Sequence, residues 1–127
     1  MQEKDLFEYA VLRVVPRVER EEFINIGVVL YCSKRKFLGV LYELNTAKLN
    51  ALCGDMDCDA LKENVTSFER ICLGGADAGT IGKLDIASRF RWLTATRSTV
   101  LQTSRAHPGL CTNPKETLLK LYQEMVL

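Results

Sequence analysis

Alternating and continuous runs of apolar residues predict three strands in the first third of the chain. The segment Phe7–Pro16 is rich in β-branched and aromatic residues and ends at a proline, which is typical of a strand. The segment Phe23–Cys32 is the most apolar of the three, and Phe37–Tyr42 follows it after a short basic turn. The short links between these segments favour an antiparallel meander.

Gly27 lies inside the second predicted strand, where a residue without a side chain weakens strand formation. We therefore expect a β-bulge at this position, or a close approach by another backbone or a ligand. The alternation along this strand predicts one continuous apolar face made of Ile24, Ile26, Val28 and Leu30.

Helical periodicity follows the strands and returns at the end of the chain. The first long helix is predicted to begin after an N-cap at Asp57 and to end at Gly74 and Gly75. Its apolar residues recur at helical spacing: Leu61, Val65, Phe68 and Cys72. A terminal helix is predicted after Asn113 as N-cap, with Pro114 in the first position. Its expected buried stripe is Leu118, Leu119, Tyr122 and Val126.

The stretch from Arg89 to Leu110 mixes arginines and hydroxyls with apolar residues, and it contains the only tryptophan and the only histidine. Arg97–Arg105 is predicted as a fourth strand, and Ala106–Gly109 as a tight loop. We expect three apolar side chains to anchor a loop before this strand: Phe90, Trp92 and Leu93.

The element order β-β-β-α-α-β-α predicts an α+β fold. The expected architecture is a two-layer sandwich, in which a mostly antiparallel four-stranded sheet carries helices on one face. The 127 residues suit a single domain over residues 1–127, which is large enough to bury a core. The formal net charge of +1 excludes a protein that coats nucleic acid by bulk electrostatics.

The cysteines and the lengths of the apolar runs indicate in which cellular compartment the protein is expected. The first five residues are polar, and no apolar run is long enough for an export signal or a membrane span. The five cysteines include no CxxC pair, so we expect reduced, mostly buried thiols in a cytoplasmic protein. A zinc site from Cys53, Cys58, His107 and Cys111 matches no common spacing, so neither a metal nor another cofactor is predicted.

Basic residues outnumber acidic ones by five to one between Lys83 and Arg105, so a preference for anions is expected to be local. Guanidinium groups and short hydroxyls bind phosphate or carboxylate through charge-assisted hydrogen bonds. Arg13 is expected to join the arginines of the fourth strand if the first and fourth strands pair. The predicted ligand-binding residues are Arg13, Asn25, Arg97, Ser98, Thr99 and Arg105. Alternatively, the arginines form structural ion pairs or lie in solvent.

Two residues are candidates for acid–base catalysis. His107 lies in a rigid His-Pro-Gly sequence, where an imidazole titrates near neutral pH. Glu22 is the acid nearest to the start of the second strand. A purely structural role is the alternative for each: His107 holds the shape of a turn, and Glu22 belongs to a solvated turn. No GxSxG nucleophile motif accompanies them.

Two long motifs resemble the domain of unknown function 3037 family of small bacterial proteins. The first is Tyr9–Pro16, which continues through Glu22 to Asn25–Leu30, and the second is Arg89–Leu110 followed by Asn113-Pro114. The resemblance spans most of the chain. It implies no established activity, so no catalytic residue follows from it. Genes of this family often neighbour those of HipA-like kinases, which implies such a kinase as a candidate partner.

Two functional hypotheses follow. The first is an interaction or regulatory module with an Arg-rich, anion-facing surface, whose partner is a HipA-like kinase. The alternative is an enzyme or binder that acts on a phosphorylated ligand, such as a nucleotide or nucleic acid. In that case Arg13, Arg97 and Arg105 hold the anion, while Glu22 and His107 serve as acid–base groups.

Overall fold

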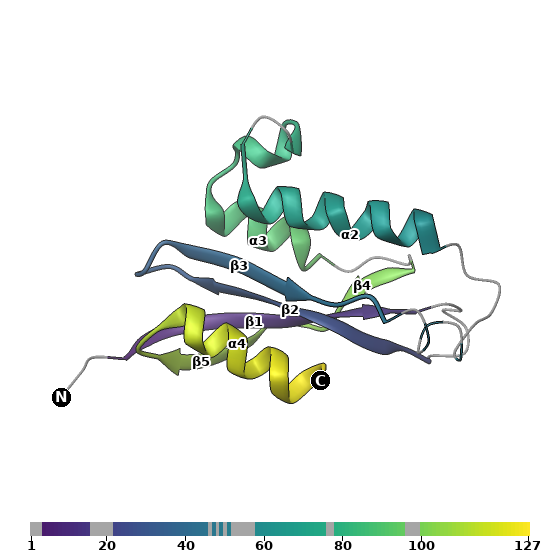
Figure 1. Cartoon of the computed structure of the whole chain (residues 1–127). Helices are drawn as coiled ribbons and strands as arrows, with labels where there is room; N and C mark the ends of the chain where they lie inside the picture. Colours follow the sequence, from purple (N-terminus) through teal and green to yellow (C-terminus); the bar gives the residue numbers. More distant parts are fainter. Residues whose placement is uncertain are drawn as a thin grey trace.

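The computed structural model describes residues 4–15, 22–45, 47, 49, 51, 58–75, 78–95 and 100–127, and it has an antiparallel sheet with helices on both faces (Figure 1). The strands are β1 (Asp5–Val14), β2 (Ile24–Cys32), β3 (Phe37–Tyr42), β4 (Leu101–Thr103) and β5 (His107–Cys111). The helices are α2 (Cys58–Leu73), the short 3-10 helix η3 (Ile81–Lys83), α3 (Ile86–Leu93) and α4 (Pro114–Met125). The predicted α+β class and antiparallel meander are confirmed.

The sheet has the strand order β3-β2-β1-β4, and β5 also pairs with β1. Because β4 pairs with Leu12–Val14 and β5 with Asp5–Tyr9, these two short strands lie end to end along the same side of β1. The sheet therefore has five strands rather than the expected four. The prediction of a tight loop at Ala106–Gly109 is wrong for His107–Gly109, because β1 is long enough to pair with this segment as well as with β4.

A β-bulge in β2 confirms the expectation for Gly27. The register shifts there, since Leu12 pairs with Gly27 while the next residue, Arg13, pairs with Asn25. A Cβ atom at Gly27 would lie 2.5 Å from the carbonyl oxygen of Leu41 in β3, so the close approach of another backbone is also confirmed. Only glycine fits at this position without displacing β3.

The bulge divides the apolar residues of β2 between the two faces of the sheet. Ile24 and Ile26 pack in the cluster beneath α2 and α3, whereas Val28 and Leu30 pack in the cluster beneath α4. The single continuous apolar face expected for this strand is therefore wrong. A strand that is apolar on both faces has to be covered on both faces.

The helices accordingly lie on opposite sides of the sheet, which differs from the expected arrangement on one face (Figure 1). The larger cluster joins β1 and β2 to α2 and α3, with Phe90 of α3 fully buried. The smaller cluster joins Phe7 and Cys32 to Leu118 of α4. None of the helices in the described ranges is long and apolar enough to cross a membrane.

The expected loop around Phe90 is instead the helix α3. Its N-cap is Asp85, whose carboxylate accepts a hydrogen bond of 2.7 Å from the backbone N–H of Ser88. Phe90 and Leu93 lie three residues apart and are both buried, whereas Trp92 is exposed. The helix thus turns two apolar residues inward and leaves the tryptophan at the surface.

Helix ends follow the sequence where the structure describes them. Gly74 ends α2 with a φ of +80°, a conformation that favours glycine. Asn113 accepts hydrogen bonds from the N–H groups of Lys115 and Glu116 at the start of α4, which confirms its prediction as an N-cap. Leu119 is exposed rather than buried. The predicted N-cap Asp57 lies outside the described residues.

Candidate functional site

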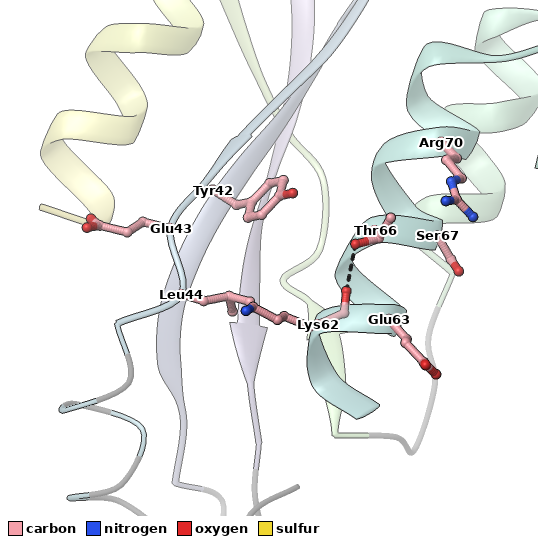
Figure 2. A pocket seen from close by; sticks show the side chains of 8 residues that line it. All are labelled: Tyr42, Glu43, Leu44, Lys62, Glu63, Thr66, Ser67 and Arg70. Carbon is pink, nitrogen blue, oxygen red and sulfur yellow. Dashed lines mark hydrogen bonds between the residues drawn. The ribbon is translucent and has the colours of Figure 1, made fainter. Parts of the chain in front are cut away.

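A polar hollow of about 740 Å³ lies where the C-terminal end of β3 meets the outer side of α2 (Figure 2). Tyr42 and Leu44 border it on the strand side. Lys62, Thr66 and Arg70 border it on the helix side, and their spacing of four residues places them along one side of α2. The regular structure of the helix therefore presents a cation, a hydroxyl and a second cation in a row.

Hydrogen bonds orient two hydroxyl groups that line the hollow, those of Thr66 and Tyr42. The hydroxyl of Thr66 donates to the carbonyl oxygen of Lys62 over 2.8 Å, and the hydroxyl of Tyr42 points toward α2 (Figure 2). The Tyr42 hydroxyl donates to the carboxylate of Glu69 over 3.4 Å. Burial raises the pKa of Tyr42, and the negative charge of Glu69 and this hydrogen bond raise it further. Tyr42 therefore stays protonated and acts as a hydrogen-bond donor rather than as a base.

The hollow carries charges of both signs. Lys62 and Arg70 are cationic, while Glu43 and Glu63 also line the hollow. Glu43 points away from α2, toward the end of α4 (Figure 2), where its charge adds to the effect of burial in raising the pKa of Tyr122. This mixture is suited to a ligand with donors, acceptors and both charges, such as a polypeptide, more than to a phosphate group.

An apolar groove of about 580 Å³ continues along the same strand. Its floor is β3 from Phe37 to Leu41, and its walls include Leu73 at the end of α2 and Leu119 near the start of α4. These two leucines are 76% and 49% exposed, so the groove has accessible apolar area at its border. We call the polar hollow and the apolar groove together the α2–β3 surface.

The strand β3, which borders both the polar hollow and the apolar groove, has a free edge within the described residues. In the described part of the chain, β3 ends the strand order and pairs with β2 alone. The N–H of Glu43 donates to the carbonyl oxygen of Ile26 in line with β2, so the inward-facing residues of β3 have odd numbers. The N–H and C=O groups of Leu38, Val40 and Tyr42 therefore point outward, away from the sheet.

Two of the predicted ligand-binding residues lie together on the α4 face. Arg13 and Asn25 are cross-strand partners beside the bulge. The guanidinium of Arg13 lies 4.1 Å from the ring centre of Phe23, and the amide of Asn25 donates to the carbonyl oxygen of Met125. In the described ranges, Nε of Arg13 and Oδ1 of Asn25 are buried without a hydrogen-bond partner. Of the predicted ligand-binding residues in the described ranges, these two are brought together by the strand pairing.

β1 and β4 do pair, but this pairing does not place Arg13 on the face where it would join the odd-numbered residues of the fourth strand. Arg13 pairs with Gln102, whereas its neighbour Leu12 pairs with Thr103. Because cross-strand partners share a face, Arg13 points to the side of the sheet opposite to Leu101 and Thr103. The odd-numbered residues of β4, the fourth strand, therefore lie on the other face of the sheet from Arg13.

The other predicted site residues are dispersed. His107 pairs with Tyr9, four residues along β1 from Arg13, which corresponds to roughly 13 Å. Glu22 is half-buried just before β2, and Arg105 is exposed between β4 and β5. Arg97, Ser98 and Thr99 lie outside the described residues. The catalytic and ligand-binding assignments remain predictions.

Two arginines of the Arg89–Leu110 stretch have structural partners. Arg89 is buried, and its Nη1 donates to the carbonyl oxygens of Ile71 and Cys72, at 3.2 Å each, at the C-terminal end of α2. Arg91 forms an ion pair with Glu8 at 3.7 Å. Arg89 therefore has a structural contact with the end of α2, and Arg91 has a largely exposed ion pair with β1.

Three cysteines are buried free thiols, as expected: Cys32, Cys72 and Cys111. Burial raises the pKa of the Cys72 thiol to about 12, so this thiol stays protonated at neutral pH. Cys53 and the side chain of Cys58 lie outside the described part of the chain. Among the residues that are described, no group of three or more histidine, cysteine, aspartate or glutamate side chains could hold a metal ion.

A family model described as a protein of unknown function (DUF3037) matches residues 9–126, which is nearly the whole chain. The chain belongs to the DUF3037 family. Both motifs that carried the resemblance lie within the matched residues, so that prediction is confirmed. Searches among curated proteins and among solved structures gave no match for this DUF3037 protein.

Sequence patterns did not single out the α2–β3 surface of this DUF3037 protein. Its polar half depends on the packing of α2 beside the end of β3, which are about twenty residues apart in the sequence. One signal was present: Lys62, Thr66 and Arg70 recur on the side of α2 opposite to its apolar stripe. Such a polar row is common on helices, and only the neighbouring strand makes it part of a hollow.

Proposed function

We propose that this DUF3037 protein is a protein-interaction module that binds an extended segment of its partner along the α2–β3 surface. The observation that carries the proposal is the free edge of β3 beside the apolar groove. An edge strand offers a row of N–H and C=O groups that pair with another strand, while adjacent pockets hold alternate side chains of that strand. The free edge and the groove supply both elements.

Features at the two ends of β3 support the same mode of binding. The exposed side chains of Leu73 and Leu119 supply apolar area next to the strand, and burying them would add to the affinity of a partner. The polar hollow beyond Tyr42 supplies cations, carboxylates and a protonated phenol for the polar part of the same segment. The mixture of charges of both signs in this hollow suits a peptide better than a phosphate.

The partner implied by the family resemblance is a HipA-like kinase, and we propose it as the first partner to test. Binding of a kinase encoded beside a DUF3037 gene is measured by co-purification and calorimetry. In Val40→Pro the outward N–H of β3 is lost, and a proline at such an edge position leaves the bonds to β2 intact. We expect binding at least about tenfold weaker, because a strand hydrogen bond is lost and the proline ring obstructs pairing.

A matched control lies on the other edge of the sheet. Pro108 of β5 has no N–H, and Leu110, two residues further on, is exposed and has the same backbone orientation. Leu110→Pro is therefore expected to bind the kinase as the wild type does. Equal binding by Val40→Pro and the wild type would exclude β3 as the binding edge.

The phosphorylated-ligand hypothesis is the second candidate, and Arg13 with Asn25 is the observation that favours it. The buried, unpartnered Nε of Arg13 and Oδ1 of Asn25 offer one donor and one acceptor side by side. Calorimetry with ATP, comparing the wild type with Arg13→Met, tests it. Heat of binding that disappears in Arg13→Met supports this site, and no heat with the wild type rejects ATP as its ligand.

A further inference from the structure

We infer that the β3 edge also takes a second copy of this chain, so that the protein pairs with itself by antiparallel addition of β3 to β3. This inference rests on the proposed function, because a partner segment and a second copy would use the same edge. It goes further in naming the occupant, and it implies that the dimer and a partner complex exclude each other.

The first argument is the hydrogen-bonding geometry of the edge. The outward-facing residues of β3 are Leu38, Val40 and Tyr42, and they are spaced evenly about Val40. An antiparallel copy centred on Val40 sets Leu38 of each chain opposite Tyr42 of the other, so that outward N–H and C=O groups meet in register. The pairing obeys a twofold axis, which is the symmetry of most homodimers.

The second argument is the order of charges along the strand. The exposed residues Lys34 and Lys36 precede β3, and the exposed Glu43 follows it. In an antiparallel pair the basic end of each copy lies beside the acidic end of the other, so both ends of the interface are complementary. A partner strand therefore needs the order basic, apolar, acidic, and β3 with its flanks has this order itself.

The third argument is the apolar area beside the edge. β3 contains neither a charged residue nor a proline, and the groove along it is bordered by Leu73 and Leu119. A flat, apolar and continuous edge is a template for further pairing unless something covers it. A second copy covers the edge of both chains at once and brings these leucines to the rim of a shared apolar interface.

The test begins with sedimentation equilibrium of the purified protein over a range of concentrations. We expect a monomer–dimer equilibrium, a dissociation constant at least about tenfold higher for Val40→Pro, and no change for Leu110→Pro. Circular dichroism checks that each variant is folded. A wild type that stays monomeric at its solubility limit, or a dimer that Val40→Pro leaves intact, overturns the inference.

Charge reversal gives a second test that does not depend on proline. The double variant Lys34→Glu/Lys36→Glu has acidic residues at both ends of β3, and Glu43→Lys has basic residues at both ends. Each is expected to dimerise at least about tenfold more weakly than the wild type because like charges meet. An equimolar mixture of the two restores opposite charges at both ends, so we expect mixed dimers close to wild-type affinity. A mixture as weak as its components overturns antiparallel self-pairing.

The outcomes separate this inference from the proposed function. If the wild type is monomeric but Val40→Pro loses the kinase, the interaction module stands and self-pairing fails. If the dimer is lost in Val40→Pro while the kinase binds all variants equally, self-pairing stands and the edge is not the kinase site. Where both hold, adding the kinase dissociates the dimer, as measured by sedimentation velocity.

Discussion

The two edges of the sheet, β4–β5 and β3, differ in how many backbone N–H and C=O groups they leave available for pairing with another strand. The β4–β5 edge consists of strands of three and five residues. Between them the hydroxyl oxygen of Ser104 accepts the N–H of Val11 at 2.9 Å, so a side chain interrupts the ladder. Pro108 removes a further donor from this edge. The opposite edge, β3, is six residues long, apolar and uninterrupted.

The difference teaches where this protein is suited to make contact. Short strands, interruptions and proline are the means by which proteins prevent unwanted pairing of an edge, and all three occur on the β4–β5 side. None occurs within β3, where helices on both faces instead leave an apolar groove along the strand. Within the described residues, the β4–β5 edge therefore has features that prevent further pairing, and the β3 edge lacks them.

The largest expected effects come from two glycines: Gly27 in β2, which contacts the edge strand β3, and Gly109 in β5 on the opposite edge. In Gly27→Ala the new Cβ meets the backbone of β3, at 2.5 Å from the carbonyl oxygen of Leu41, so the open-edge strand has to move. In Gly109→Ala the new Cβ meets the ring of Phe7, a side chain that can shift. We expect a loss of about 3 kcal/mol in unfolding free energy for the first and about 1 kcal/mol for the second. Urea unfolding measures both, and equal losses would contradict the tight β2–β3 contact.

The pH dependence of stability tests the burial beneath the open edge. The Cys72 pKa is raised from 9.0 to about 12, so above pH 9 the unfolded chain loses this proton before the folded chain does. The neutral thiol makes its full contribution to the unfolding free energy below pH 9, and this contribution falls as the pH rises toward 12. At about pH 10.5 the expected loss is about 2 kcal/mol.

Urea unfolding at about pH 8.5 and about pH 10.5 measures this loss, with Cys72→Ala as the control. The variant is less stable at both values because it leaves a cavity, but its decrease with pH should be smaller. The variant should still lose some stability as the pH rises, because the pKa values of Tyr42 and Tyr122 are also raised. The same pH dependence in both proteins would show that Cys72 is not the group responsible.

The smallest expected effect concerns the protected edge. Ser104→Ala leaves the N–H of Val11 without the hydroxyl oxygen that accepts it, which should lower the unfolding free energy by about 1 kcal/mol. Because this change is on the β4–β5 side, dimerisation should be unaffected. Sedimentation equilibrium checks this. Weaker dimers in Ser104→Ala would indicate that the dimer interface involves the β4–β5 edge and would contradict its assignment to β3.

Local patterns predicted the parts of the fold that depend on neighbouring residues. β3 was found with its observed ends, Gly27 marked the bulge, and Asn113 marked the start of α4. The side of the sheet on which each helix lies was not predictable in this way. It depends on the bulge, which sends Ile26 to one face and Val28 to the other.

The errors have physical causes. The helix α3 spans only eight residues, so its periodicity was too short to recognise, although Asp85 was available as an N-cap. β5 contains Pro108 and Gly109, which are typical of turns, and it becomes a strand because the side of β1 opposite to β2 extends beyond its pairing with β4. The α2–β3 surface combines distant segments, so neither its hollow nor its groove has a local signature.

Residue-resolved hydrogen exchange of the β3 amides tests the central claim most directly. In a dilute solution of monomers, the inward amides of Phe37, Gly39 and Leu41 should be protected, while the outward amides of Leu38, Val40 and Tyr42 exchange rapidly. At high protein concentration the outward amides should become protected as well, because β3 then pairs with a second copy. Outward amides that exchange rapidly at every concentration would contradict the assignment of this edge as the self-pairing interface.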